Sequence, residues 1–108
     1  MVVDDLLFAV SESGSAACLD AKTGKLEWEN EFPGLFFASI VAFGQNVMFT
    51  SESGDAWLVN CGRRFLLTAR NSFGEKIYAT PVPQKDAILI RTLGNLYCVA
   101  AGIDRPRL

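Results

Sequence analysis

The side chains of this 108-residue sequence that are able to do chemistry are carboxylates, cysteine thiols and a pair of arginines. Histidine, which often serves as a general base or a metal ligand, is absent. The only acidic doublet is Asp4-Asp5, near a terminus, where fraying is common. No nucleophile stands beside a plausible base, and no phosphate-binding glycine loop occurs. The sequence therefore predicts no catalytic residue and argues against an enzyme.

A second group of carboxylates alternates along residues 25–31, KLEWENE. Glu27, Glu29 and Glu31 fall on one face of a strand, and Trp28 falls on the other. A cation site is one interpretation of this pattern. An outer strand whose charges prevent edge-to-edge pairing is the other, and it is the one we expect. The three carboxylates are therefore predicted to face solvent.

The three cysteines, an odd number, do not make a framework of paired disulfides. Cys18 and Cys98 are eighty residues apart, and each lies in an apolar, strand-like segment. A zinc site requires closely spaced cysteine or histidine ligands, and this sequence has no such spacing. We expect buried free thiols and predict no metal site.

The composition is that of one ordinary domain: half of the residues are hydrophobic, a fifth are charged, and the net charge is −2. This balance does not favour nucleic acid as a partner, and Arg63-Arg64 is too small a basic group to change that. No apolar stretch is long enough to span a bilayer. The opening MVVDDLLFAV also lacks the basic segment of a secretory signal. We expect a cytoplasmic location if the chain is complete, and a periplasmic one if it is a fragment of an exported protein.

A repeat organises the whole sequence. At an offset of forty residues, Gly14, Gly54 and Gly94 align within FAVSESGSAACLD, MFTSESGDAWLVN and ILIRTLGNLYCVA. In each copy an apolar segment runs into a glycine turn and then into a second apolar segment, which is typical of a β-hairpin. We expect all three glycines to supply the positive φ of a tight turn.

The hairpins belong to repeats of about forty residues, and no window has the apolar period of an amphipathic helix. An all-β fold of antiparallel four-stranded propeller blades is predicted, in an incomplete propeller. The blades are expected at residues 1–35, lacking its first strand, at 36–75 and at 76–108, where Pro106 keeps any last strand short. Strands are predicted near residues 6–11, 15–20, 25–31, 37–43, 46–51, 56–60, 65–70, 77–82, 87–92 and 95–100, with an eleventh in the tail.

Two segments, GSAACLDAKTGKLEW at 14–28 and YATPVPQKDAILIRTLGNLYCVA at 78–100, resemble the repeat of the PQQ-like β-propeller family. That repeat reads Gly-x-apolar-Tyr-Ala-Leu-Asp-x-x-Thr-Gly-x-apolar-x-Trp, and its bearers include quinoprotein dehydrogenases and BamB-like assembly lipoproteins. The tryptophan that closes the family repeat packs between blades, and the resemblance implies this role for Trp28. We expect Trp57 and its counterpart Tyr97 to pack between blades as well, because large aromatics dominate sheet cores.

The resemblance concerns the fold more than the chemistry. Quinoprotein dehydrogenases share a calcium site, a catalytic aspartate and usually a vicinal disulfide, and none of these is carried over to this sequence. No two cysteines are adjacent here, and no stacking platform for the cofactor can be assigned. No cofactor is therefore predicted. The alternative is a fragment of a PQQ-dependent oxidoreductase, or of another small-ligand-binding propeller, with a site near 37–43 and 77–82. A sugar-binding propeller would require an exposed aromatic platform, for which Trp57 is the first candidate.

Fewer than three complete blades cannot close a ring, since propellers hold roughly four to eight. The open blade faces predict either a fragment of a longer propeller or association of copies through those faces. We expect a non-catalytic module for protein interaction or scaffolding. Its partner is another protein or a second copy of the chain. The loops at 12–15, 52–55, 62–64 and 72–76 are candidate contacts, with Arg63, Arg64 and Phe73 as the residues to mutate.

Overall fold

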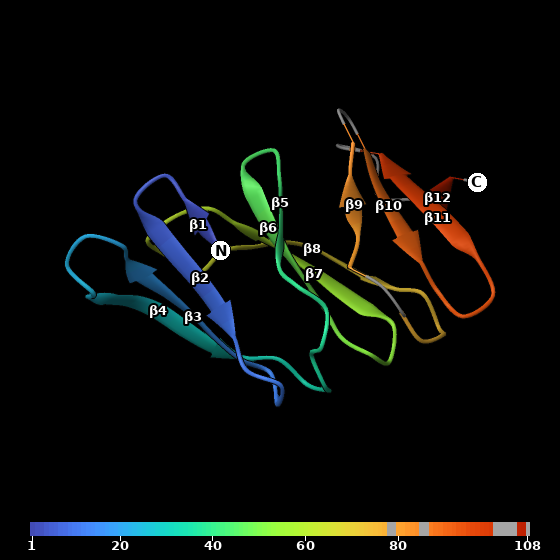
Figure 1. The fold of residues 1–108 in the computed structure, drawn as a ribbon, viewed down its shortest axis with the longest axis horizontal. Helices are drawn as coiled ribbons and strands as arrows, with labels where there is room; N and C mark the ends of the chain where they lie inside the picture. The colour runs from blue at the N-terminus through green and yellow to red at the C-terminus, as the bar shows by residue number, and fades with distance from the viewer. Residues whose placement is uncertain (78–79, 85–86, 101–105, 108) are drawn as a thin grey trace.

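Three antiparallel four-stranded sheets make up the fold (Figure 1). The computed structural model describes residues 1–77, 80–84, 87–100 and 106–107. Within each sheet the strands follow one another in sequence order, and the three sheets lie side by side along the longest axis. The predicted all-β class with antiparallel four-stranded blades is confirmed, and the described chain does not close into a ring.

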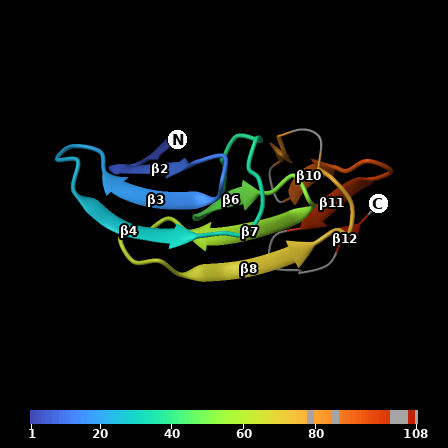
Figure 2. The ribbon, with the colours of Figure 1, turned by 90° about the horizontal axis from the view of Figure 1, so that it is seen from below.

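The sheets take their strands from consecutive parts of the chain. The first sheet contains β1 (Val2–Val3), β2 (Leu6–Val10), β3 (Ser15–Asp20) and β4 (Leu26–Glu31). The second contains β5 (Val41–Phe43), β6 (Asn46–Thr50), β7 (Asp55–Asn60) and β8 (Leu67–Ser72). The third contains β9 (Val82–Pro83), β10 (Ala87–Arg91), β11 (Leu96–Ala100) and β12 (Pro106–Arg107). In Figure 2, β4 and β8 lie along the lower side of the molecule.

Burial follows the position of each sheet in the row. In β2, Leu6 and Phe8 are buried, whereas Ala9 is exposed, because only one face of the first sheet meets a neighbour. In β6 of the middle sheet, both Val47 and Met48 are buried, and so are the two residues that follow. The middle sheet is therefore covered on both faces.

Two apolar clusters fill the contacts between sheets. We call the contact between the first and second sheets the first junction; its buried side chains are Leu6, Phe8, Ala16, Cys18, Trp28, Phe32, Phe36, Val47, Phe49, Trp57 and Val59. We call the contact between the second and third sheets the second junction; its buried side chains are Val41, Met48, Ala56, Ile77, Ile88 and Ile90.

The repeated Ser-Glu-Ser-Gly turns join neighbouring sheets. Gly14 has φ +98°, and a Cβ placed there would lie 2.0 Å from the carbonyl oxygen of Phe32. Phe32 N–H donates to Gly14 O at 2.8 Å. Gly54 repeats the arrangement: its φ is +106°, its Cβ would lie 2.1 Å from Glu75 O, and its own carbonyl accepts from Phe73 N–H at 2.9 Å. Only glycine allows this approach of the backbone, and this explains the repetition of the turn.

The third hairpin differs from the first two, and the prediction for its glycine is wrong. Gly94 does not have a positive φ. Pairing of Arg91 with Leu96 leaves four residues, 92–95, in the turn, whereas the second hairpin leaves five, 51–55. The one-residue deletion removes the need for a left-handed turn and moves β10 by one position relative to β6. Ile88 and Ile90 consequently face the second sheet.

Several strands differ in extent from the prediction. Val2–Val3 pair with β2, so the first sheet has a short first strand where none was expected. The predicted strand 37–43 is reduced to Val41–Phe43, because the preceding chain bonds to hairpin turns instead, as when Phe36 N–H donates to Glu12 O. Of the predicted strand 77–82, Val82 lies in β9 and Ile77 forms an isolated bridge with Thr92, while residues 78–79 lie outside the described residues. Of the predicted tail strand, only Pro106–Arg107 is described.

Candidate functional site

Arg63 ties the second sheet to the outer corner of the first. It stands in the β7–β8 loop, and its Nη1 donates to Asp20 Oδ2 at 2.9 Å and also to the Glu27 carboxylate. The backbone N–H of Thr23, the Arg63 guanidinium and the N–H of Lys22 together lower the pKa of Asp20 to about 2. This predicted partner-contact residue is therefore engaged within the chain.

The ion pair corrects the prediction for the acidic strand. The register passes from Cys18–Trp28 to Leu19–Leu26, so Glu27 is the extra residue of a β-bulge. A bulge redirects a side chain, and the Glu27 side chain is only 10% exposed beside Arg63. Glu27 is therefore not a solvent-facing edge charge.

The tryptophans lie inside the first junction. Trp28 is 7% exposed, and its Nε1–H donates to Gly62 O at 3.1 Å, which links the first sheet to the second. Trp57 is 4% exposed and stacks on Phe32 with ring centroids 4.9 Å apart. The Arg70 guanidinium covers the Trp57 ring at 5.6 Å. Trp57 is therefore not available as a sugar platform, because its faces are already occupied.

The remaining predicted positions are divided between core and surface. Phe73 packs against Tyr97 with centroids 4.7 Å apart, and both residues are half-buried beside the second junction. Phe73 thus lies at a sheet contact. Arg64 is exposed and forms no ion pair with any described residue. Of the three predicted partner-contact residues, Arg64 alone has neither an ion pair nor an aromatic contact among the described residues.

Cys18 belongs to the first junction, where it pairs with Trp28 across β3 and β4. Cys18 is buried and Cys61 half-buried, and all three cysteines are free thiols. Burial raises the pKa of both the Cys18 and Cys61 thiols, and this lowers their thiolate fraction at neutral pH. Within the described residues, no three His, Cys, Asp or Glu side chains gather closely enough to hold a metal ion.

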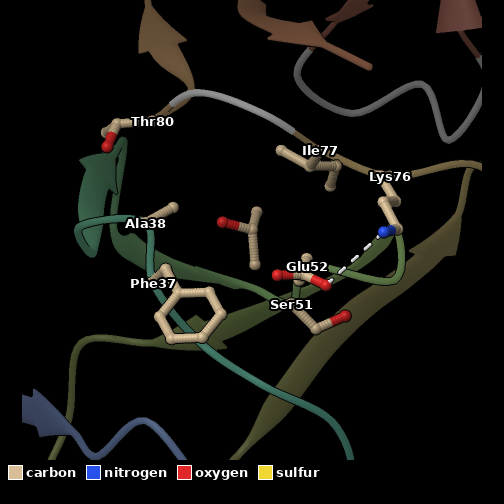
Figure 3. A pocket seen from close by; sticks show the side chains of 8 residues that line it. Phe37, Ala38, Ser51, Glu52, Lys76, Ile77 and Thr80 are labelled. Atoms are coloured by element: carbon tan, nitrogen blue, oxygen red, sulfur yellow. Dashed lines mark ion pairs between the residues drawn. The ribbon is translucent and has the colours of Figure 1, made fainter. Parts of the chain in front are cut away.

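A cavity of about 240 Å³ opens at the second junction, beside the segments near 37–43 and 77–82 where the alternative small-ligand site was predicted (Figure 3). We call it the junction pocket. Its walls come from three separate segments: residues 37–38, residues 50–52, and Lys76, Ile77 and Thr80. Figure 3 shows Phe37 and Thr80 on one side, and Lys76 with Glu52 on the other.

The polar groups of the junction pocket are unevenly satisfied. Thr50 is 2% exposed, and its hydroxyl has no hydrogen-bond partner among the described residues. The Thr80 hydroxyl accepts from Ser39 N–H at 3.1 Å. Lys76 Nζ lies 3.9 Å from Glu52 Oε1, and these two side chains are 60% and 40% exposed. The pocket therefore has one buried hydroxyl without a partner and a loose ion pair at its edge.

These features define a partial β-propeller, in which four-stranded antiparallel blades stand side by side without closing. One similar solved structure is that of BamB from Moraxella catarrhalis, with a TM-score of 0.80 and 18% sequence identity. The alignment covers 96% of this chain and 33% of the BamB chain, so the chain spans about a third of that protein. This likeness establishes the propeller fold.

Neither the protein-family models nor the curated proteins contain a match to this sequence. A search of the described residues for a long apolar helix able to cross a membrane found none.

Proposed function

We propose that the chain is a PQQ-like repeat module whose function is protein interaction through the faces of its two outer sheets. The first end face consists of Leu7, Ala9, Ala17 and Leu19, at most half-buried on the side of the first sheet opposite the first junction. The same positions of the second sheet, forty residues on, are Val47, Phe49, Trp57 and Val59, and all four are buried against the neighbouring sheet.

The last end face lies on the far side of the third sheet. Val82, Leu89 and Cys98 form one row across β9, β10 and β11, with Leu96 beside it. Val82 is 51% exposed and Leu96 57% exposed. Each end face is an apolar surface of the kind that a further blade covers inside a propeller.

The occupant that we propose is a second copy of the chain, with the last end face of each copy against the first end face of the other. The chain contributes three sheets, and two copies would bring six, within the roughly four to eight blades of known propellers. The contact would bury apolar surface as the two internal junctions do. Additional blades of a longer propeller are the competing occupant.

Light scattering after size exclusion, over a dilution series, tests this proposal. We expect twice the 11.8 kDa chain mass for the native protein. The variants Leu19→Glu and Leu96→Glu, each altered on one end face, should lose the closed dimer. When mixed, they should form a one-to-one pair, because each retains the face that the other lacks. Leu66→Glu, at an exposed loop position, is the matched control and should behave as the native protein. A stable monomer at every concentration would contradict association of copies.

The alternative function, binding of PQQ, fits the junction pocket poorly. The cofactor is a rigid tricarboxylate, whereas the pocket offers one ammonium, Lys76, already beside Glu52. The cavity is also smaller than the roughly 300–1,000 Å³ of pockets that enclose drug-sized ligands. The pocket does lie between the segments near 37–43 and 77–82 that were predicted for a small ligand.

A further inference from the structure

The lining of the junction pocket differs from the equivalent place in the first junction, and the first difference is one side chain. Phe36 N–H donates to Glu12 O in the first junction, and Ile77 N–H donates to Glu52 O in the second. The Phe36 ring is buried and lies against Phe32 and Trp57, with centroids 6.1 and 5.6 Å away. Ile77 has no ring, so an aliphatic side chain lines the junction pocket at the position that an aromatic side chain occupies in the first junction.

A second difference gives the space a polar wall. Val10 pairs with Ala16 at the end of β2, and Thr50 pairs with Ala56 at the same place in β6. Valine and threonine have nearly the same shape, so the change adds little except a hydroxyl. That hydroxyl is buried and unpartnered among the described residues, which is rare and unfavourable in a protein interior. A bound molecule that completes the hydrogen bond would account for it.

A third difference adds charge. Leu35 O accepts from Glu52 N–H where the chain enters the second sheet, and Lys76 O accepts from Leu93 N–H at the equivalent place of the third. Lys76 thus replaces a leucine and sets an ammonium beside the Glu52 carboxylate. Because both side chains are well exposed and 3.9 Å apart, their mutual attraction is weak and easily exchanged for other partners.

We propose that the junction pocket binds a small zwitterion of the α-amino-acid type. The edge of the pocket carries one positive and one negative side chain, so a ligand with a single charge would be repelled by one of them. A carboxylate can accept from Lys76 and from the Thr50 hydroxyl, while an ammonium can donate to Glu52. Phe37 and Ile77 provide apolar walls for an aliphatic side chain (Figure 3).

The size of the cavity supports the same class. About 240 Å³ accommodates a molecule of a few carbon atoms with its polar groups, below the range of drug-sized ligands. Thr80 offers a further hydroxyl proton, since its oxygen accepts from Ser39 and it has no acceptor among the described residues. This site is independent of the end faces, and its failure would leave the proposed interaction function untouched.

The test is a titration of the full ¹⁵N-labelled chain with L-valine in the millimolar range, followed by amide chemical shifts. We expect saturable shifts at Thr50, Glu52 and Ile77. Isovalerate, which lacks the ammonium, and isobutylamine, which lacks the carboxylate, should bind at least about tenfold more weakly. Equal binding of either analogue would overturn the zwitterion assignment. No saturable shift with L-valine would mean that the cavity holds water only, and would overturn the proposal altogether.

Variants locate the site. Thr50→Val should weaken binding of L-valine at least about tenfold while melting no lower than the native chain, since it copies Val10. Glu52→Gln, at a half-exposed position, should weaken binding of L-valine and leave that of isovalerate unchanged or stronger. Thr68→Val is the matched control, because this exposed hydroxyl on β8 bonds to Asn46, away from the pocket. Unchanged affinity in both Thr50→Val and Glu52→Gln would contradict binding at this pocket.

Discussion

The two junctions share a backbone and differ in their side chains. In both, the chain that leaves a sheet bonds to that sheet's hairpin glycine, at 2.8 Å for Phe32 and 2.9 Å for Phe73. Both also contain an aromatic pair: Phe32 stacks on Trp57 with centroids 4.9 Å apart, and Phe73 lies tilted against Tyr97 with centroids 4.7 Å apart. The repeat therefore preserves the hydrogen bonds that set the spacing of neighbouring blades.

The side chains around that common frame have diverged. Phe36, Phe49 and Phe65 surround the aromatic pair of the first junction, which becomes a continuous aromatic core. Ile77 and Ile90 occupy the corresponding places of Phe36 and Phe49 in the second junction, and Ile77 also lines the junction pocket. The first junction is therefore the more aromatic of the two, and the second is the more aliphatic.

Alanine at the hairpin glycines should disrupt the backbone contacts that both junctions share, and we expect it to reduce stability the most. In Gly14→Ala and Gly54→Ala the new Cβ would lie about 2 Å from a backbone oxygen, at a φ that L-residues rarely adopt. We expect each to lower the free energy of unfolding by at least about 3 kcal/mol, in urea titrations followed by circular dichroism. Gly24→Ala, at φ +77° but with nothing within 4 Å of the new Cβ, is the control for backbone strain without a clash and should cost less. A comparable loss in the control would contradict the clash.

Truncating one aromatic residue of each pair should show how tightly each junction is packed. Trp57→Ala removes a 4% exposed ring from the aromatic core and should cost about 3–5 kcal/mol in the same urea titration. Tyr97→Ala removes a half-buried ring and should cost about 1–2 kcal/mol, since part of its surface is already in water. Equal losses would show that the second junction is as tightly packed as the first.

Replacing Thr50 by valine and Val10 by threonine should change the free energy of unfolding in opposite directions. Thr50→Val removes the unpartnered hydroxyl and should raise the free energy of unfolding by about 1 kcal/mol. Val10→Thr introduces a hydroxyl beside the aromatic core and should lower it by about 1 kcal/mol. Thermal melts of the two variants and of the native chain, all without ligand, would show whether each substitution raises or lowers stability. A destabilised Thr50→Val would mean that its hydroxyl is satisfied.

Acid should reveal a small electrostatic difference between the junctions. The pKa of Asp20 is about 2, against an ordinary 3.8, because Thr23 N–H, Arg63 and Lys22 N–H favour its carboxylate. A lowered carboxyl pKa adds stability above the ordinary value, and that stability is lost as pH falls from about 3.8 to about 2. Asp20→Asn should therefore lose less stability over this interval than the native chain, in acid titrations followed by circular dichroism.

The second junction has its own acid-sensitive carboxylate. Thr92 Oγ1–H, Gly94 N–H and the Asn95 side chain donate to Glu75, and they lower its pKa below the ordinary 4.5. Glu75→Gln should likewise flatten the acid dependence, starting just below pH 4.5. Both effects should be the smallest of those described, because water screens these exposed groups. A steeper acid transition in either variant would contradict the sign.

The fold could largely be predicted from the sequence. The repeated turn and the alternating apolar segments gave the three hairpins, because strand period and turn chemistry are local properties. The sequence does not show that the segments before Val41 and Val82 bond to hairpin turns instead of to a neighbouring strand. The predicted strands that end near these residues were therefore too long. The shortened third hairpin was hidden as well, since Gly94 aligns with Gly14 and Gly54 although its backbone does not.

The candidate sites were less accessible. The role of Arg63 depends on a bulge at Glu27, and no alternation pattern reveals a bulge. The lining of the junction pocket differs from that of the first junction at equivalent residues. That difference becomes readable once the second junction is aligned at an offset of forty-one, which sets Ile77 against Phe36. The change from a large to a small side chain was the available signal.

The hydrogen bonds between connecting segments and hairpins have a mechanical consequence. The segment before β5 is held by Gly14 and Glu12 of the first sheet, and its Leu35 holds Glu52 of the second. A pull on either end of the molecule is therefore passed from blade to blade through the backbone, and not through side-chain contacts alone. In a repeat protein, such strong coupling between neighbours favours rupture of the whole array in one step over the release of single blades.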